Sequence, residues 1–119
     1  MALLGYTRIS TVHQDDQLQR DALLKAGVLP EHIYSDVVSG SKDVRTRPGM
    51  MKLLQFVRAE DTIVVWRIDR LGRSLLDVLA TVADFRASGI QVQSISDGID
   101  PSTTSGRLLL HMLSTLAEY

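Results

Sequence analysis

Two hydrophobic periodicities alternate along this 119-residue chain. Short apolar or β-branched runs, some of them alternating with polar residues, predict strands at about 3–9, 32–37, 62–66 and 90–95. Between and after these runs, apolar residues recur three and four positions apart and predict helices at about 11–27, 48–59, 75–88 and from 107 onward. Strand and helix therefore alternate throughout, which is typical of an α/β domain with a largely parallel sheet.

Residues with capping or turn preferences mark the ends of these predicted helices. Two pairs have the spacing of a capping box, in which a hydroxyl accepts a hydrogen bond from a backbone N–H three residues on: Thr11 with Gln14, and Ser74 with Asp77. Three other residues fit helix ends, namely Pro48 in a first turn and Gly27 and Gly89 after a last turn. The segment at 39–49, rich in Ser, Gly and charge, is expected to be a loop.

The last predicted helix is apolar on more than one face. Such a helix needs to be covered, and we expect it to be the start of a longer helix that packs on a partner subunit. The residues assigned to that interface are Leu108, Leu109, Met112, Leu113 and Leu116. The alternative, an ordinary helix of the domain's own core, fits the same pattern.

Composition narrows the class of protein. With 45% hydrophobic and 23% charged residues the chain has ordinary globular composition, and its length suits one domain. It has no cysteine, and its three histidines lack metal-ligand spacing, so we expect neither disulfides nor a bound metal. Neither a signal peptide nor a run long enough to span a membrane is evident, so a cytoplasmic protein is expected.

The charge is unevenly distributed. The net charge is −1, yet residues 41–73 carry eight Lys and Arg against four Asp and Glu, a local charge of +4. Arginine outnumbers lysine in the whole chain by ten to three. A guanidinium matches phosphate or carboxylate in a bidentate geometry, so the bias becomes informative if these side chains converge.

Polar side chains gather where two predicted strands end. The first strand ends in Tyr6, Arg8 and Ser10, which share one face because strand side chains alternate. The third is followed by Arg67, Asp69, Arg70 and Arg73. If both strands are parallel and adjacent, these groups share one crevice at the carboxyl edge of the sheet. Simpler structural roles are also available, with Ser10 as an N-cap and Asp69 as an ion-pair partner.

A serine among arginines, without metal ligands, suits attack on a phosphodiester. Such a reaction needs alignment and neutralisation of phosphoryl charge, both of which arginines supply. Arginines just before a helix also oppose its dipole unless an anion or carboxylate lies there, which favours a bound phosphate. The G-x-S-x-G motif of serine hydrolases does not occur.

Several motifs in consistent order along the whole chain give it a family resemblance. "GYTRIST", "SDVVSGS", "RPG", "VVWRIDRLGRS", "SDGID" and the closing "AEY" resemble the serine recombinases of the resolvase/invertase family. The resemblance implies a three-layer α/β/α fold, with a mostly parallel, mixed central sheet of the resolvase-like type. It divides the chain into a catalytic domain at 1–101 and the start of a long dimerisation helix at 102–119, with a C-terminal DNA-binding domain absent from this chain.

The resemblance also implies a reaction. Family members cut DNA with a serine that becomes linked to the 5′ phosphate, exchange subunits within a tetramer, and religate the strands without a cofactor. Carried over, Ser10 is the nucleophile, and the other catalytic positions are Arg8, Asp69, Arg70, Arg73 and Arg47. Supporting or phosphate-binding positions are Tyr6, Gln14, Gln19, Asp36, Ser39 and Arg45. The implied partners are double-stranded DNA, a homodimer and homotetramer formed through the last helix, and an accessory DNA-bending protein.

Two departures from the family pattern stand out. The loop before "RPG" is two residues longer, so the family's loop arginine is either Arg47, our choice because it precedes Pro-Gly, or Arg45. Phe56 stands where resolvases and invertases commonly carry a basic residue, so either Lys52 or Arg58 substitutes for that residue or the contact is absent.

Two other functions remain as alternatives, a non-catalytic DNA-associated regulator and a small phosphate- or nucleotide-binding α/β domain. A regulator with a decayed site should have lost some of the catalytic residues, yet these are intact. A nucleotide-binding domain should have a glycine-rich phosphate loop, and neither common form of that loop occurs. The sequence leaves open whether the reaction is inversion, resolution or integration.

Overall fold

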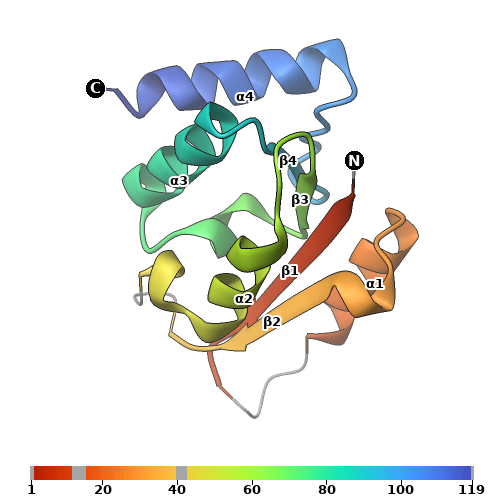
Figure 1. Ribbon diagram of the computed structural model, residues 1–119. Coiled ribbons are helices and arrows are strands. Elements are labelled where there is room, and N and C mark those ends of the chain that lie inside the picture. Colours follow the sequence, from red (N-terminus) through yellow and green to blue (C-terminus); the bar gives the residue numbers. More distant parts are fainter. Residues whose placement is uncertain (1, 12–15, 40–42, 119) are drawn as a thin grey trace.

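The computed structural model describes residues 2–11, 16–39 and 43–118. The strands are β1 Leu3–Ile9, β2 Ile33–Val37, β3 Thr62–Val65 and β4 Gln91–Ser94. The α-helices are α1 Gln17–Lys25, α2 Pro48–Phe56, α3 Leu75–Ala87 and α4 Thr104–Leu116. Short 3₁₀ turns, η1 Pro30–His32, η2 Val44–Thr46 and η3 Ile68–Leu71, lie in the connections (Figure 1). The strand–helix alternation predicted from the sequence is confirmed.

The sheet has the strand order β2-β1-β3-β4, and every pair of neighbours is parallel. This confirms the predicted α/β fold. The expectation that the sheet is mixed is wrong, because all of its paired strands run parallel. In the described part of the chain, antiparallel pairing outside the sheet's strands is limited to an isolated bridge between Ser94 and Ile99. The bridge closes the turn after β4 rather than adding a strand.

Two apolar clusters on opposite faces of the sheet make the fold three-layered. On one face Leu23 and Val28, at the end of α1 and just after it, pack against Val64 of β3. On the other face α2 and α3 pack on a larger core that includes the fully buried Met50 and Val82. Helix α4 lies along α3 and adds Leu110 to that core (Figure 1). The predicted α/β/α layering is confirmed.

Helix ends follow the capping signals in most places. Ser74 accepts a hydrogen bond from the backbone N–H of Asp77 at the start of α3, and Gly27 and Gly89 adopt positive φ just after α1 and α3. Helix α4 begins at 104, three residues before the expected start, because the Thr103 hydroxyl caps it by accepting from Gly106.

Two predicted helix bounds are wrong. Helix α2 ends at Phe56 instead of Ala59, since Val57 already has extended backbone angles. Helix α1 begins at Gln17 rather than near residue 11, and Asp16 is its N-cap residue. The predicted capping box of Thr11 and Gln14 involves Gln14, which lies outside the described residues.

The sheet register sets up the crevice at its carboxyl edge. The β1–β3 pairing ends at Tyr6 opposite Val65, whereas β1 continues along β2 as far as Ile9 opposite Val37. The end of β1 thus projects beyond β3, and the chain leaving β3 turns into η3 beside that projection (Figure 1). Residues following both strands therefore face each other, as parallel neighbouring strands require.

Candidate active site

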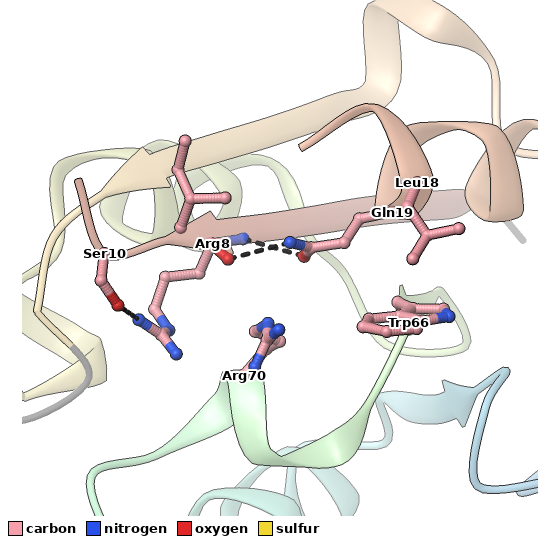
Figure 2. Close-up of a pocket in the computed structure, with 7 residues that line it drawn as sticks. Arg8, Ser10, Leu18, Gln19, Trp66 and Arg70 are labelled. Atoms are coloured by element: carbon pink, nitrogen blue, oxygen red, sulfur yellow. Dashed lines mark hydrogen bonds between the residues drawn. The ribbon is translucent and has the colours of Figure 1, made fainter. Parts of the chain in front are cut away.

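A cleft of about 330 Å³ opens at this edge of the sheet. Strand β1 and the residue after it contribute Arg8, Ile9 and Ser10, α1 contributes Leu18 and Gln19, and the segment after β3 contributes Trp66 and Arg70 (Figure 2). Ser10, Arg8 and Arg70, all predicted catalytic residues, lie around the same opening. The convergence expected from the two strand ends is therefore present in the structure.

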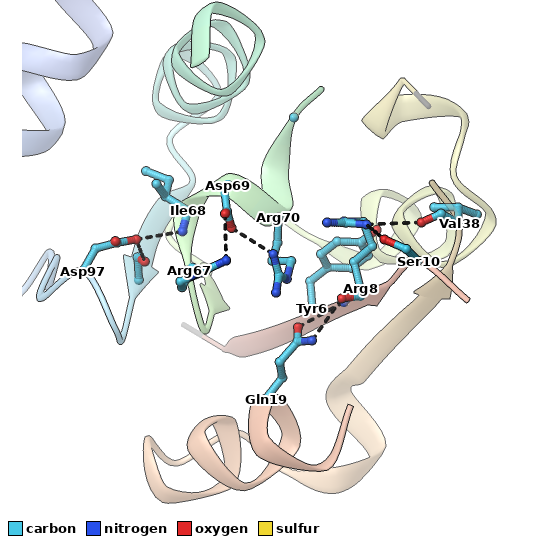
Figure 3. A network of polar contacts seen from close by, with 12 residues as sticks. Tyr6, Arg8, Ser10, Gln19, Val38, Arg67, Ile68, Asp69, Arg70 and Asp97 are labelled. Carbon is cyan, nitrogen blue, oxygen red and sulfur yellow. Dashed lines mark hydrogen bonds and ion pairs between the residues drawn. The ribbon is translucent and has the colours of Figure 1, made fainter. Parts of the chain in front are cut away.

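Arg8 and Ser10 are joined directly. Arg8 Nη1 donates a hydrogen bond to Ser10 Oγ at 3.1 Å and another to the carbonyl of Val38 at 3.2 Å (Figure 3). Ser10 is exposed, so its hydroxyl is accessible to a large substrate. A guanidinium at hydrogen-bond distance from a hydroxyl also stabilises negative charge that develops on or near that oxygen.

Gln19 holds the backbone of Arg8 from α1. Its Oε1 accepts from the N–H of Arg8 at 3.1 Å and its Nε2 donates to the carbonyl of Arg8 at 3.0 Å. The start of α1 is anchored in turn by Asp16, whose carboxylate accepts from the Thr7 hydroxyl and from Arg20 Nε. Gln19, almost fully buried, thus acts as a positioning residue for the strand end that carries the serine.

Trp66 organises the opposite wall. The guanidinium carbons of Arg67 and Arg70 lie 5.1 Å and 5.8 Å from the centroid of its ring, a cation–π geometry. Asp69 bridges the same two arginines, at 3.1 Å from each (Figure 3). Ring and carboxylate together hold Arg70 toward the cleft.

Beneath the cleft lies a buried polar cluster. The Tyr6 hydroxyl donates to Asp36 Oδ2 at 2.7 Å, and the same carboxylate accepts from the first-turn N–H groups of Gly49 and Met50 in α2. Arg47 is fully buried and donates to the Tyr6 hydroxyl. Burial, together with the neighbouring Asp36 carboxylate, raises the pKa of Tyr6 well above its ordinary value, so Tyr6 remains a hydrogen-bond donor.

The cleft is strongly positive. Burial, and then the positive charges of Arg70 and Arg47, lower the pKa of Arg8 from its ordinary value. The Nε atoms of Arg8, Arg67 and Arg70 are buried and have no hydrogen-bond partner in the described part of the chain. An anion entering the cleft would relieve this repulsion, which fits the phosphate expected there.

Other predicted site residues lie away from the cleft lining. Arg73 pairs with Asp77 at 3.6 Å and with Asp43 at 4.0 Å, so carboxylates of the chain itself offset the dipole conflict expected at the start of α3. Asp69 faces Arg67 and Arg70 but is exposed, and Ser39 is exposed after β2. Gln14 lies outside the described residues.

The two loop arginines have different environments. Arg47 reaches the carbonyls of Arg70 and Gly72 at 2.7 Å and 3.3 Å, whereas Arg45 is exposed and pairs with Asp84 of α3. Arg47 thus supports the arginine-bearing turn from beneath, and Arg45 belongs to another surface.

Phe56, which stands where the family commonly has a basic residue, does not line the cleft and lies elsewhere in the fold. It is 63% exposed and stacks on Tyr34 at 6.2 Å, beside a hollow lined also by Ala2 near the start of β1. Lys52 and Arg58 are both exposed, and neither lines the cleft.

Two residues of the cleft lining, Trp66 and Leu18, are not among the site residues predicted from the sequence. Trp66 directly follows β3, and its place at the end of the apolar run is a signal that it lies at the carboxyl edge. Leu18 lies in the helix predicted at 11–27, but it is 63% exposed and lines the cleft. Leu23, five positions later in α1, covers the sheet instead.

Comparison with known proteins defines the class. The protein-family model of the resolvase N-terminal domain matches residues 3–119 of this chain. The chain is 41% identical to the DNA-invertase hin of Salmonella typhimurium, over 99% of this chain and 60% of that protein. It is 45% identical to a DNA-invertase of Escherichia phage P1, over 98% of this chain and 60% of that protein.

Among solved structures, the N-terminal catalytic domain of TP901-1 integrase matches with a TM-score of 0.81 at 34% identity, covering 99% of this chain and 95% of that one. The chain therefore belongs to the resolvase N-terminal domain family, the serine recombinase family indicated by its motifs. It spans about three fifths of the length of the curated relatives it matches.

None of the helices in the described part of the chain combines the length and apolarity needed to cross a bilayer. The described residues also contain no group of three or more His, Cys, Asp or Glu side chains placed to hold a metal ion.

Proposed function

We propose that this chain cleaves and rejoins DNA strands in site-specific recombination, with Ser10 as the nucleophile. The observation that carries the proposal is the position of Ser10 Oγ, 3.1 Å from Arg8 Nη1 at the mouth of a cleft that Arg70 also lines. Relatives named DNA-invertase and resolvase support this reaction over the alternatives of a regulator or a nucleotide-binding domain.

The proposed chemistry is a transesterification. Ser10 Oγ attacks the scissile phosphorus, the bond from phosphorus to the 3′ oxygen breaks, and a 5′-phosphoserine and a free 3′ hydroxyl result. The serine proton is released and the 3′ oxygen takes one up, so no energy donor is consumed. Arg8 and Arg70 neutralise the phosphoryl oxygens as charge builds up on them. Rejoining is the reverse attack by a 3′ hydroxyl.

The remaining site residues take supporting roles in this proposal. Arg47, rather than Arg45, is the loop arginine that supports the site, because its guanidinium holds the backbone of Arg70. Arg73 binds phosphate in the DNA complex, where the phosphate replaces the 4.0 Å contact to Asp43. Asp69 orients Arg70. The other supporting residues position these groups from neighbouring elements: Tyr6, Gln14, Gln19, Asp36 and Ser39.

The proposed partners follow from this reaction. Double-stranded DNA is the substrate, which places the protein with the DNA in the bacterial cytoplasm. Exchange of strands requires at least two copies, and we propose a homodimer and a homotetramer that associate through α4, with an accessory DNA-bending protein as a further partner. In this scheme residues 1–101 form the catalytic unit and residues 102–119 begin the association helix.

The test is covalent attachment of protein to 5′ DNA ends. The chain is fused to a heterologous DNA-binding domain and offered a plasmid with two matching sites, and denaturing gels detect adducts. Ser10→Ala should abolish the adduct while the circular dichroism spectrum stays that of the parent, since this exposed hydroxyl contributes little packing. Ser88→Ala, an exposed serine after α3, is the matched control and should retain the adduct.

Adducts that persist in Ser10→Ala would contradict the proposal and would mean that another residue is the nucleophile, with the exposed Ser39 tested next. Retention of the adduct in Ser88→Ala shows that its loss in Ser10→Ala reports the nucleophile rather than folding or association.

A further inference from the structure

The turn that carries Arg70 is capped by a distant residue. Its N-cap residue, Arg67, makes no side-chain cap hydrogen bond. Instead, Asp97 Oδ2 accepts from the backbone N–H of Ile68 at 2.8 Å, across 29 positions of the chain (Figure 3). The first N–H groups of a helical turn need an acceptor from outside, and here the turn between β4 and α4 supplies it.

Asp97 is itself held in place. The hydroxyl of Ser94, a fully buried residue, donates to the same Oδ2 at 2.5 Å. The backbones of Ser94 and Ile99 exchange hydrogen bonds of 2.9 Å and 3.0 Å, which close the turn around Asp97. The N–H of Ser96 donates to the carbonyl of Trp66 at 2.7 Å, so this turn is also fastened to the chain leaving β3.

The turn η3 is held by packing and by a small number of backbone hydrogen bonds: Leu71 is fully buried in the core, and Ile68 packs against that core. Within it a backbone hydrogen bond runs from the N–H of Arg70 to the carbonyl of Arg67 at 3.2 Å. Arg47 holds its other end by donating to the carbonyl of Arg70. Asp97 at the start and Arg47 at the end therefore hold the backbone of the turn, while the Trp66 ring and the Asp69 carboxylate orient the Arg70 side chain.

We propose that Asp97 is a positioning residue for the cleavage reaction, fixing the arginine-bearing turn through the backbone of Ile68. Asp97 does not line the cleft, so its effect acts through Arg70 and Trp66 rather than through contact with DNA. The inference rests on the proposed function for its kinetic consequence, but its structural consequence can be measured without DNA.

Trp66 provides that measurement. It is the sole tryptophan of the chain, and its ring lies against both guanidiniums that the turn orients. Asp97→Ala should shift the Trp66 emission and remove the hydrogen-exchange protection of the Ile68 amide. It should also slow adduct formation roughly ten-fold or more, the scale expected when a catalytic group is misplaced by a fraction of an ångström to an ångström.

A conservative variant separates positioning from charge. Asp97→Asn keeps an acceptor oxygen for the Ile68 N–H and should retain most of the emission, the protection and the rate. Asp100→Ala is the matched control, because the Asp100 carboxylate accepts from Ser102 in the same connection and does not reach η3. All three readouts should stay parent-like in that variant.

Specific outcomes overturn the inference. Parent-like emission and Ile68 protection in a folded Asp97→Ala protein would do so, as would an Asn variant as impaired as the Ala variant. If Asp97→Ala fails to fold, Ser94→Ala takes its place, since it removes only the hydroxyl that orients the carboxylate, and an unchanged emission and protection there contradicts the inference. Failure of the proposed function would give a different result. The parent protein would form no adduct, while Asp97→Ala would still change the Trp66 emission and the hydrogen-exchange protection of the Ile68 amide.

Discussion

At the scale of single residues, Asp36 shows how one side chain serves both stability and the site. Its carboxylate, almost fully buried, accepts two N–H groups of the first turn of α2 and the hydroxyl of Tyr6. A carboxylate at a helix N-terminus is favoured by the dipole, and three donors compensate for its burial. The same contacts place Tyr6 and α2 beneath the arginine-lined cleft.

Asp36→Ala should therefore destabilise the chain strongly. It leaves three buried donors without their acceptor, so we expect a loss of about 3 kcal/mol or more in the free energy of unfolding. Urea denaturation measures it. Asp21→Ala is the control, because Asp21 is exposed and accepts from Gln17 on the surface of α1, and it should change stability by less than about 0.5 kcal/mol. Equal losses in the two variants would contradict this account of Asp36.

At the scale of elements, connections between distant segments hold together the starts of the two central strands, β1 and β3. Asp61, at the turn before β3, accepts from the N–H of Ala2 and from the N–H of Arg58, each at 2.9 Å. It thus joins the start of β1 to the connection between α2 and β3. Burial alone would raise the pKa of Asp61, but these two N–H groups outweigh it, so the pKa lies below its ordinary value.

This lowered pKa predicts a pH dependence of stability. A carboxyl whose folded-state pKa is depressed contributes stability that is fully present above its unfolded pKa of about 3.9 and is lost as the pH falls through the lower folded-state value. Asp61→Asn removes this titration, so its free energy of unfolding should decline less steeply than the parent's from about pH 5 to about pH 2. Urea denaturation across that range measures both curves, and parallel curves would count against the assignment.

At the scale of the whole molecule, α4 divides its apolar residues between two surfaces. Leu110 is buried and Leu113 packs against the chain's own core, so one side of the helix belongs to the domain. Leu108, Met112 and Leu116, spaced four apart, are each more than half exposed. The interpretation as an ordinary core helix thus describes one side of α4, and the exposed stripe on its other side is the surface that we propose for association.

Polar substitutions in that stripe should weaken association. Burying one such side chain contributes about 1.5 kcal/mol or more, so Met112→Gln with Leu116→Gln should raise the dimer dissociation constant at least about ten-fold. Sedimentation velocity across a concentration series measures it. Leu29→Gln, at a residue 51% exposed before η1, should leave self-association unchanged. An unchanged dissociation constant in the double variant would exclude this stripe as the interface.

Features that depend on neighbours along the chain were predictable from the sequence. The strand–helix alternation, the caps at Ser74 and Gly89, and the gathering of Arg8 and Ser10 on one face all follow from local preferences and from the two-residue period of a strand. Membership of the family rested on the same local motifs.

How these segments pack against one another was not predictable from the sequence and required the three-dimensional structure. Three features join segments that are distant in sequence: the offset between β1 and β3, the pairing of Arg73 with Asp43, and the cap that Asp97 gives to η3. A fourth, the burial of Arg47, distinguishes this arginine from its neighbour Arg45. Local preference cannot supply these choices, because each depends on how whole elements pack and which buried polar groups then find partners.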